Sequence, residues 1–141
     1  MTGVLDVCGA MEILLQKEKA DAFGNIVQEA ALVIAPDLYI SELTNTLWKY
    51  YRAAILTKDE CVQYIKDGIS YVDKFINGKD MWQEAFSEGI NNNHSIYDMF
   101  YMVTARRNDG VLITNDSVLA EICRNNNIQI YDPVPKTGGH Q

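Results

Sequence analysis

Four acidic residues stand at the ends of apolar or structured segments of this chain, and carboxylates in such places can hold a metal ion. They are Asp6, Glu42, Asp98 and Asp116. In an open α/β sheet, the carboxyl ends of the strands and the neighbouring helix starts share one crevice, where ligands bind. Carboxylates that converge there repel one another unless a cation neutralises them. Because Mg²⁺ and Mn²⁺ prefer carboxylate oxygens, the pattern predicts a metal site for phosphodiester cleavage.

The chemistry has a clear use for such a site. Hydrolysis of a phosphodiester needs a nucleophilic hydroxide, which a bound metal supplies by lowering the pKa of water. It also needs stabilisation of the charge on the transition state, which one or two metal ions supply. Both the one-metal and the two-metal arrangement remain open from the sequence.

Each acid also has a purely structural explanation. Asp6 and Asp116 could each cap the helix that follows a strand. Asp98 could complete a capping box with Ser95, and Glu42 could favour the positive end of a helix dipole. The joint pattern favours the metal site, because two acids end strands and two lie near helix starts, which are places that share one rim.

The elements that would position these acids alternate along the chain. Continuous apolar runs at residues 32–35 and 111–113 are typical of strands buried on both faces of a parallel sheet, and residues 4–5 and 128–131 are shorter strand candidates. Strands that alternate with helices predict an α/β fold, with a central parallel β-sheet flanked by α-helices on both faces.

Helical patterns fill the segments between the strands. One apolar stripe recurs at steps of three and four residues and comprises Ile40, Leu43, Leu47, Tyr50 and Ala54. Residues 57–60 form a capping box that opens a second helix running toward Asn77. Residues 81–91 and 95–107 are predicted as further helices, and Asp116 opens the last one.

The composition bounds the class of protein. The 141 residues, 48% hydrophobic and 22% charged, predict one globular domain over residues 1–132 and a flexible tail over residues 133–141. No apolar run reaches the ~18 residues that span a bilayer, and no secretory signal is recognisable. Three widely spaced cysteines predict neither disulfides nor a zinc site, which fits a reducing, cytoplasmic location without a membrane partner.

The net charge of −7 argues against binding of nucleic acid by bulk electrostatics alone. A local basic rim remains available, and its candidate RNA contacts are Lys49, Arg52, Arg106 and Arg107. The aromatic and basic run at residues 48–52 could belong to the protein surface, to a protein interface or to a surface that stacks on RNA bases.

Four segments together resemble the signature segments of the PIN domain, and most closely those of its VapC-type single-domain toxins. They are residues 4–6 (VLD), 41–45 (SELTN), 95–105 (SIYDMFYMVTA) and 112–120 (LITNDSVLA). Each segment alone is a weak signal, whereas four in this order and spacing cover nearly the whole chain, from Val4 to Tyr131.

The resemblance implies a parallel sheet flanked by helices and an endoribonuclease that depends on Mg²⁺ or Mn²⁺. It assigns metal coordination and catalysis to the four acids, and it assigns a supporting hydroxyl to Thr114. Asn45, one helical step from Glu42, is a candidate supporting or substrate contact, and satisfaction of a polar group in the core explains it equally well. The implied partners are an RNA substrate, a second copy of the chain in a homodimer, and a VapB-type antitoxin whose tail reaches the acidic site.

One neighbour of the site departs from the family pattern. The first acid is usually followed two residues later by Ser or Thr, and Cys8 stands there instead. A thiol is a weaker hydrogen-bonding group than a hydroxyl, so a catalytically weak or inactive PIN-like module is the alternative prediction. Cys8 is not expected to be a nucleophile, because neither His94 nor His140 has a recognisable pairing context.

Phosphoryl-transfer proteins of other α/β classes form a second alternative. A receiver domain or a dehalogenase-like phosphatase needs a second acid beside the first strand and a Lys after a late strand. Residues 6–8 (DVC) lack the second acid and no Lys follows Ile113 directly, so this alternative is disfavoured.

Overall fold

The computed structural model describes residues 1–133 of the chain. A flexible tail is predicted for residues 133–141, and all of it except Pro133 lies outside the described residues. The strands of the sheet are β1 (Thr2–Leu5), β2 (Leu32–Pro36), β3 (Lys74–Ile76) and β4 (Val111–Ile113). They are all parallel and lie in the order β3-β2-β1-β4. β1 is therefore central, with Val4 paired to Ile34 of β2 on one side and to Leu112 of β4 on the other.

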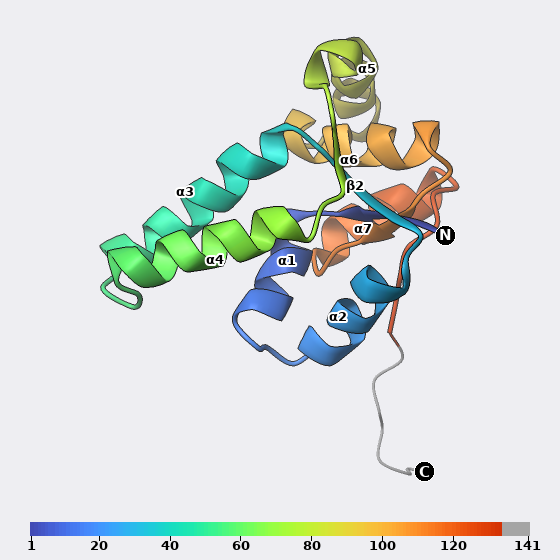
Figure 1. Cartoon of the computed structure of the whole chain (residues 1–141). Helices are drawn as coiled ribbons and strands as arrows, with labels where there is room; N and C mark the ends of the chain where they lie inside the picture. The colour runs from blue at the N-terminus through green and yellow to red at the C-terminus, as the bar shows by residue number, and fades with distance from the viewer. Residues whose placement is uncertain (134–141) are drawn as a thin grey trace.

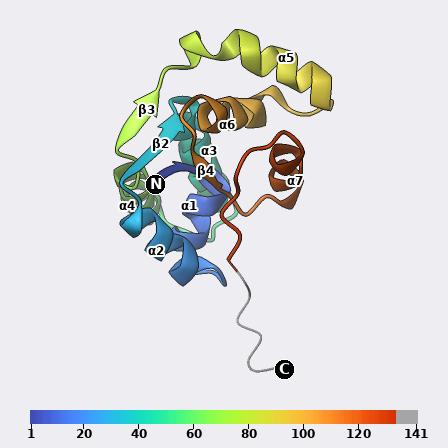
Figure 2. The ribbon, with the colours of Figure 1, turned by 90° about the vertical axis from the view of Figure 1, so that its right-hand side faces the viewer.

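The helices connect the strands in chain order. They are α1 (Val7–Leu14), α2 (Ala20–Glu29), α3 (Leu38–Arg52), α4 (Lys58–Ser70), the short 3-10 helix η1 (Gly78–Asp80), α5 (Trp82–Asn92), α6 (Ile96–Arg107) and α7 (Ser117–Asn125). Helix α6 packs on β1, β2 and β4, and α5 packs on the outside of α6 (Figures 1 and 2). α1 packs with α2, α3 and α4, and α2 also contacts β1. The predicted central parallel sheet with helices on both faces is confirmed.

Several predicted elements agree with the structure. The capping box at Thr57 is present, since the Thr57 hydroxyl accepts from the Glu60 amide and the Glu60 carboxylate accepts from the Thr57 amide. The predicted strands at the N-terminus, at β2 and at β4 are also present, as are the helices α3, α5, α6 and α7. The buried runs of β2 and β4 explain the success, because a strand covered on both faces has no polar alternation to obscure it.

Other predictions were wrong in part. The helix after Thr57 ends at Ser70 instead of running toward Asn77, because residues 74–76 leave it to pair with β2. Residues 128–131 contribute a single bridge, between Leu112 and Ile130. On α3, Ile40 is 37% exposed, while Tyr39 is fully buried and donates to the Gly68 carbonyl at 2.7 Å.

Within residues 1–133, none of the helices has the length and the apolar character that crossing a bilayer requires.

Candidate metal and nuclease site

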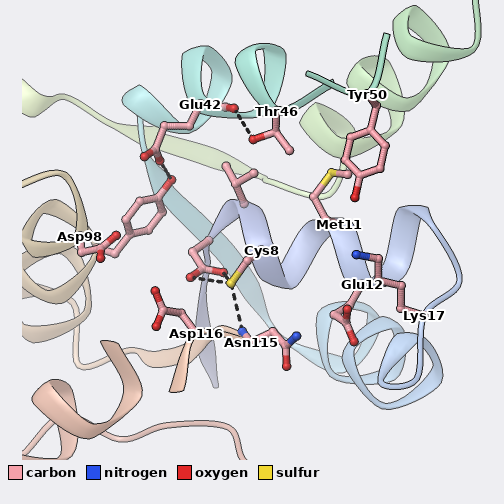
Figure 3. Close-up of a pocket in the computed structure, with 13 residues that line it drawn as sticks. Cys8, Met11, Glu12, Lys17, Glu42, Thr46, Tyr50, Asp98, Asn115 and Asp116 are labelled. Atoms are coloured by element: carbon pink, nitrogen blue, oxygen red, sulfur yellow. Dashed lines mark hydrogen bonds between the residues drawn. The ribbon is translucent and has the colours of Figure 1, made fainter. Parts of the chain in front are cut away.

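The four acids reach one cavity from four separate elements. Asp6 follows β1, Asp116 follows β4 by three residues, Glu42 lies in the first turns of α3, and Asp98 lies in the first turn of α6. All four line a cavity of about 370 Å³. Figure 3 labels Glu42, Asp98 and Asp116 among its lining residues. Because β1 and β4 are adjacent parallel strands, their carboxyl ends lie side by side. The fold thus brings the four acids together as the sequence predicted.

Asp6 is the most enclosed of the four acids. Only 6% of the residue is exposed, and its carboxylate caps α1 by accepting from the Gly9 amide at 2.8 Å. The Thr114 hydroxyl donates to the same carboxylate. Burial raises the pKa of Asp6 to about 7 even though these hydrogen bonds lower it, and the nearby Asp98 raises it slightly further. A carboxyl in this state gains from a neighbouring positive charge.

Thr114 joins the two strand-end acids. While its hydroxyl donates to Asp6, the same oxygen accepts from the Asp116 amide at 3.0 Å. Asp116 in turn caps α7, accepting from the amides of Val118 and Leu119 at 3.0 and 3.1 Å. Asp116 therefore has the capping role and also lines the cavity. The placement of Thr114 agrees with the supporting role that the family resemblance assigns to it.

Tyr101 holds the acid of α3, a contact that was not foreseen. Its hydroxyl donates to Glu42 Oε1 at 2.7 Å, and both residues line the cavity. Burial raises the pKa of Glu42 against the Tyr101 hydrogen bond that lowers it, and Asp98 raises it further. Burial also raises the pKa of Tyr101, so its hydroxyl stays protonated and donates. The available signal was spacing, because Tyr101 lies three residues after Asp98 on α6 and so shares its face.

His94 holds the acid of α6. His94 Nε2 lies 2.7 Å from Asp98 Oδ2, and the two residues are four positions apart. Ser95 is the N-cap of α6, but its side chain makes no capping hydrogen bond, so the predicted capping box at residues 95–98 was wrong. The carboxylate turns instead toward His94 and the cavity. His94 is consequently a positioning residue for Asp98.

The donor set suits a hard divalent cation in its chemistry. Four acidic residues line one cavity, and burial raises the pKa values of Asp6 and Glu42, an effect that a bound cation would reverse. Within residues 1–133, no three Asp, Glu, His or Cys side chains stand close enough together to form a ready-made metal site. Cation binding therefore has to compete with the hydrogen bonds from Tyr101, His94 and the helix caps.

The remaining predicted site residues lie elsewhere. Asn45 is exposed and is not among the residues that line the cavity, whereas the next residue, Thr46, does line it. None of the four candidate RNA contacts lines it either. Arg106 and Arg107 pair with Glu84 of α5.

The other two basic candidates lie on α3. The guanidinium of Arg52 lies 4.7 Å from the centre of the Trp48 ring, and Lys49 is exposed. Among residues 1–133, the basic side chain that lines the cavity is that of Lys17, which follows α1. Nothing in the sequence around Lys17 predicts this position.

Cys8 occupies the position where the family pattern has a hydroxyl. Its thiol lies 3.5 Å from both carboxylate oxygens of Asp6 and 3.4 Å from the Thr114 hydroxyl, and it accepts from the Asn115 amide at 3.3 Å. Burial raises the pKa of Cys8 to about 12, and the charge of Asp6 adds to this effect. The thiol is protonated at neutral pH, as expected for a residue that is not a nucleophile.

Replacing this thiol by a hydroxyl should improve the site. A serine hydroxyl makes stronger hydrogen bonds to Asp6 and Thr114 than a thiol does, a difference of about 1 kcal/mol. We expect Cys8→Ser to raise the rate of RNA cleavage about fivefold. The matched control is Cys61→Ser, since Cys61 is buried outside the cavity and its thiol donates to the Leu47 carbonyl. A rate that is equal to or below that of the unmodified chain would show that the thiol does not limit the site.

Comparison with known proteins places this geometry in context. Ribonuclease VapC3 of Pyrobaculum aerophilum is 25% identical over 120 residues, which cover 84% of this chain and 92% of that protein. The crystal structure of PAE2754 from Pyrobaculum aerophilum superposes with a TM-score of 0.71 at 17% identity, over 86% of this chain and 84% of that one.

A second solved structure has the same fold. The crystal structure of VapBC2 from Rickettsia felis, bound to a DNA fragment from its promoter, superposes with a TM-score of 0.65 at 14% identity, over 93% of this chain and 98% of that one. No family model matches the chain. The relative in sequence and the neighbours in structure nevertheless confirm the predicted resemblance of this chain to VapC-like PIN domains.

Proposed function

We propose that this chain is a metal-dependent endoribonuclease and the toxin of a VapBC-type toxin–antitoxin pair. The observation that carries the proposal is the convergence of Asp6, Glu42, Asp98 and Asp116 on one cavity from four elements. The similarity to a VapC ribonuclease over most of the chain supports RNA as the substrate. A cytoplasmic location belongs to the same proposal, since three free cysteines suit a reducing compartment.

The four acids would hold Mg²⁺ or Mn²⁺, which supplies an activated hydroxide and neutralises charge on the phosphoryl group. Asp6 is fixed in place by the Gly9 amide and the Thr114 hydroxyl, and Asp116 is fixed by its capping bonds to α7. Tyr101 and His94 orient the other two acids. Hydrogen bonds of this kind commonly set the affinity of a site for its metal.

Cleavage of RNA by the purified chain tests the proposal. We expect a structured RNA to be cut in buffer with Mg²⁺ or Mn²⁺ and to stay intact when a chelator removes the ion. Restoring the ion should restore cleavage, which separates loss of the metal from loss of the fold. Cleavage that persists at the same rate in the chelator would contradict a metal-dependent mechanism.

A catalytically weak PIN-like module that binds RNA or a protein is the second candidate. The observation that favours it is Cys8, whose thiol replaces a hydroxyl beside Asp6 and Thr114. Such a module would bind RNA without cutting it under any metal condition, and Cys8→Ser would then bring cleavage out. RNA that the unmodified chain binds and leaves intact, and that Cys8→Ser cuts, would favour this candidate over the nuclease.

The proposed partners include a VapB-type antitoxin and a second copy of the chain. The structural neighbour from Rickettsia felis is described as VapBC2 with promoter DNA, which supports an antitoxin partner. α5 presents Trp82, Phe86 and Ile90 at steps of four residues, with exposures of 57%, 54% and 65%. This apolar stripe supports a homodimer, because large contiguous apolar faces commonly mark protein interfaces. Light scattering that gives the mass of one chain, without any concentration dependence, would exclude the homodimer.

A further inference from the structure

The cavity that holds the four acids has a second end with a different chemistry. Figure 3 shows Glu42, Asp98 and Asp116 on one side of Cys8, while Met11, Tyr50 and Lys17 lie on the other side. Met11 is buried, with 5% exposed, and forms part of the floor. One end with three of the four acids and one end with Tyr50, Lys17 and Glu12 thus share one continuous space.

Two elements build this second end. α3 lines the cavity with residues 42, 46 and 50, which are four positions apart and therefore on one face of the helix. From Glu42 to Tyr50 this face advances about 12 Å. The turn after α1 supplies Lys17, and buried Glu12 holds this turn, since its carbonyl accepts from the Lys17 amide at 2.9 Å and its carboxylate accepts from the Lys19 amide at 3.3 Å.

Four polar side chains line this end of the cavity, those of Glu12, Lys17, Thr46 and Tyr50. Glu12 accepts from the Lys19 amide and Thr46 donates to the Glu42 carbonyl, whereas Lys17 and Tyr50 are available to a ligand. Lys17 is exposed and forms no salt bridge within residues 1–133. Tyr50 is partly buried, and over the same residues its hydroxyl makes no hydrogen bond to another side chain or to the backbone. A nucleotide offers a phosphate and the face of a base. The lysine at this end of the cavity can bind the phosphate, and the tyrosine ring can stack on the base.

We propose that this end of the cavity is a nucleotide subsite for single-stranded RNA, in which Tyr50 stacks on a base and Lys17 binds a backbone phosphate. The inference rests on the proposed function and adds to it the residues that hold the strand beside the acids. Aromatic rings stack on any base, so the subsite positions the strand without selecting its sequence. Lys17 supplies the positive charge that the acidic end of the cavity lacks.

Binding of a labelled single-stranded oligoribonucleotide of about 12 nucleotides tests the subsite. The Asp98→Asn background in Mg²⁺ keeps the probe uncleaved. We expect Tyr50→Ala to weaken binding about tenfold, while Tyr50→Phe, which keeps the ring, stays within about twofold. Lys17→Ala should weaken binding. It should also make the fall of the log association constant with log salt concentration shallower by about 0.7, because one phosphate contact is lost.

Matched controls are available on α4. Tyr64 has the same intermediate exposure as Tyr50, Lys66 is exposed like Lys17, and neither lines the cavity. Tyr64→Ala and Lys66→Ala should leave RNA binding unchanged. If Tyr50→Ala does not fold, Tyr50→Leu keeps the apolar bulk without the ring and gives the same comparison. Effects equal to those of the controls would overturn the subsite.

An RNA with single abasic positions sharpens the assignment. One abasic position should weaken binding to the unmodified cavity about as much as Tyr50→Ala does, and it should cost nothing further in the Tyr50→Ala variant. Variants that spare RNA and weaken only a VapB-type tail peptide would overturn the inference in favour of a peptide site. RNA binding at Tyr50 without any cleavage by the intact chain would refute the nuclease and leave the subsite standing. Cleavage with an unchanged KM in both Tyr50→Ala and Lys17→Ala would refute the subsite and leave the nuclease standing.

Discussion

Asp98→Asn should lower the rate of RNA cleavage by roughly a thousandfold while leaving the fold intact. The substitution removes one negative charge from the wall of the cavity and keeps the size of the side chain. The loss of one charged ligand from a hydrolytic metal site is expected to cost about 4 kcal/mol of transition-state stabilisation, which corresponds to that factor. The measurement is the single-turnover rate at saturating Mg²⁺, together with the thermal midpoint of the same preparation.

The control for this prediction is Asp59→Asn. Asp59 is an exposed acid in the first turn of α4, outside the cavity, so its change removes the same charge without touching the site. We expect an unchanged rate. Equal rates for Asp98→Asn and Asp59→Asn would show that the cavity is not the site of cleavage, even if the chain cuts RNA.

Asp6→Asn should have opposite effects on activity and on stability. Burial raises the pKa of Asp6 from its usual value of 3.8 to about 7. As the pH rises from about 4 to about 7, the unfolded chain loses this proton before the folded chain does. The metal-free fold therefore loses up to about 4 kcal/mol over this range, and the loss is complete above pH 7.

Asparagine is neutral at every pH. Its oxygen can accept from the Gly9 amide, and its NH2 group, in the place of Oδ2, can donate to the Thr114 hydroxyl oxygen. In a chelator, the free energy of unfolding of Asp6→Asn should match that of the unmodified chain near pH 4 and exceed it at pH 8. The variant should nevertheless be inactive. Chemical denaturation across this pH range measures the difference, and parallel curves for the two proteins would mean that Asp6 titrates normally in the fold.

Much of the site was accessible from the sequence because its acids occur at element boundaries. Asp6 and Asp116 follow buried strands that the apolar runs identify, and parallel pairing brings the ends of those strands together. Helix positions for Glu42 and Asp98 followed from the stripe on α3 and from the helix start at residue 96. The order of the elements thus predicts which carboxylates line the same cavity.

The contacts that orient the acids were not accessible in the same way. Tyr101 of α6 donates to Glu42 of α3, and the two residues are 59 positions apart in the sequence, so no local pattern encodes the pair. His94 bonds Asp98 where a capping box was the simpler expectation. The three-residue strand β3 was missed because so short a segment shows no periodicity, and it forms only through its register with β2.

The basic residues show the limit of composition. Arg106 and Arg107 have the charge that RNA requires, but their position on α6 faces the acids of α5, where Glu84 and Glu88 pair with Arg106. Lys17 has no feature in the sequence that separates it from the other lysines, and only the turn after α1 directs it to the cavity.

Calorimetric titration with Mn²⁺ tests the central claim most directly, because it asks whether the four acids form one cation site without requiring a known RNA target. We predict saturable binding to the unmodified chain at neutral pH, release of protons on binding because Asp6 is partly protonated at its pKa of about 7, and loss of binding in Asp6→Asn. Asp59→Asn should bind as the unmodified chain does. The absence of saturable binding, or binding that Asp6→Asn leaves unchanged, would contradict the assignment of the four acids to a metal site.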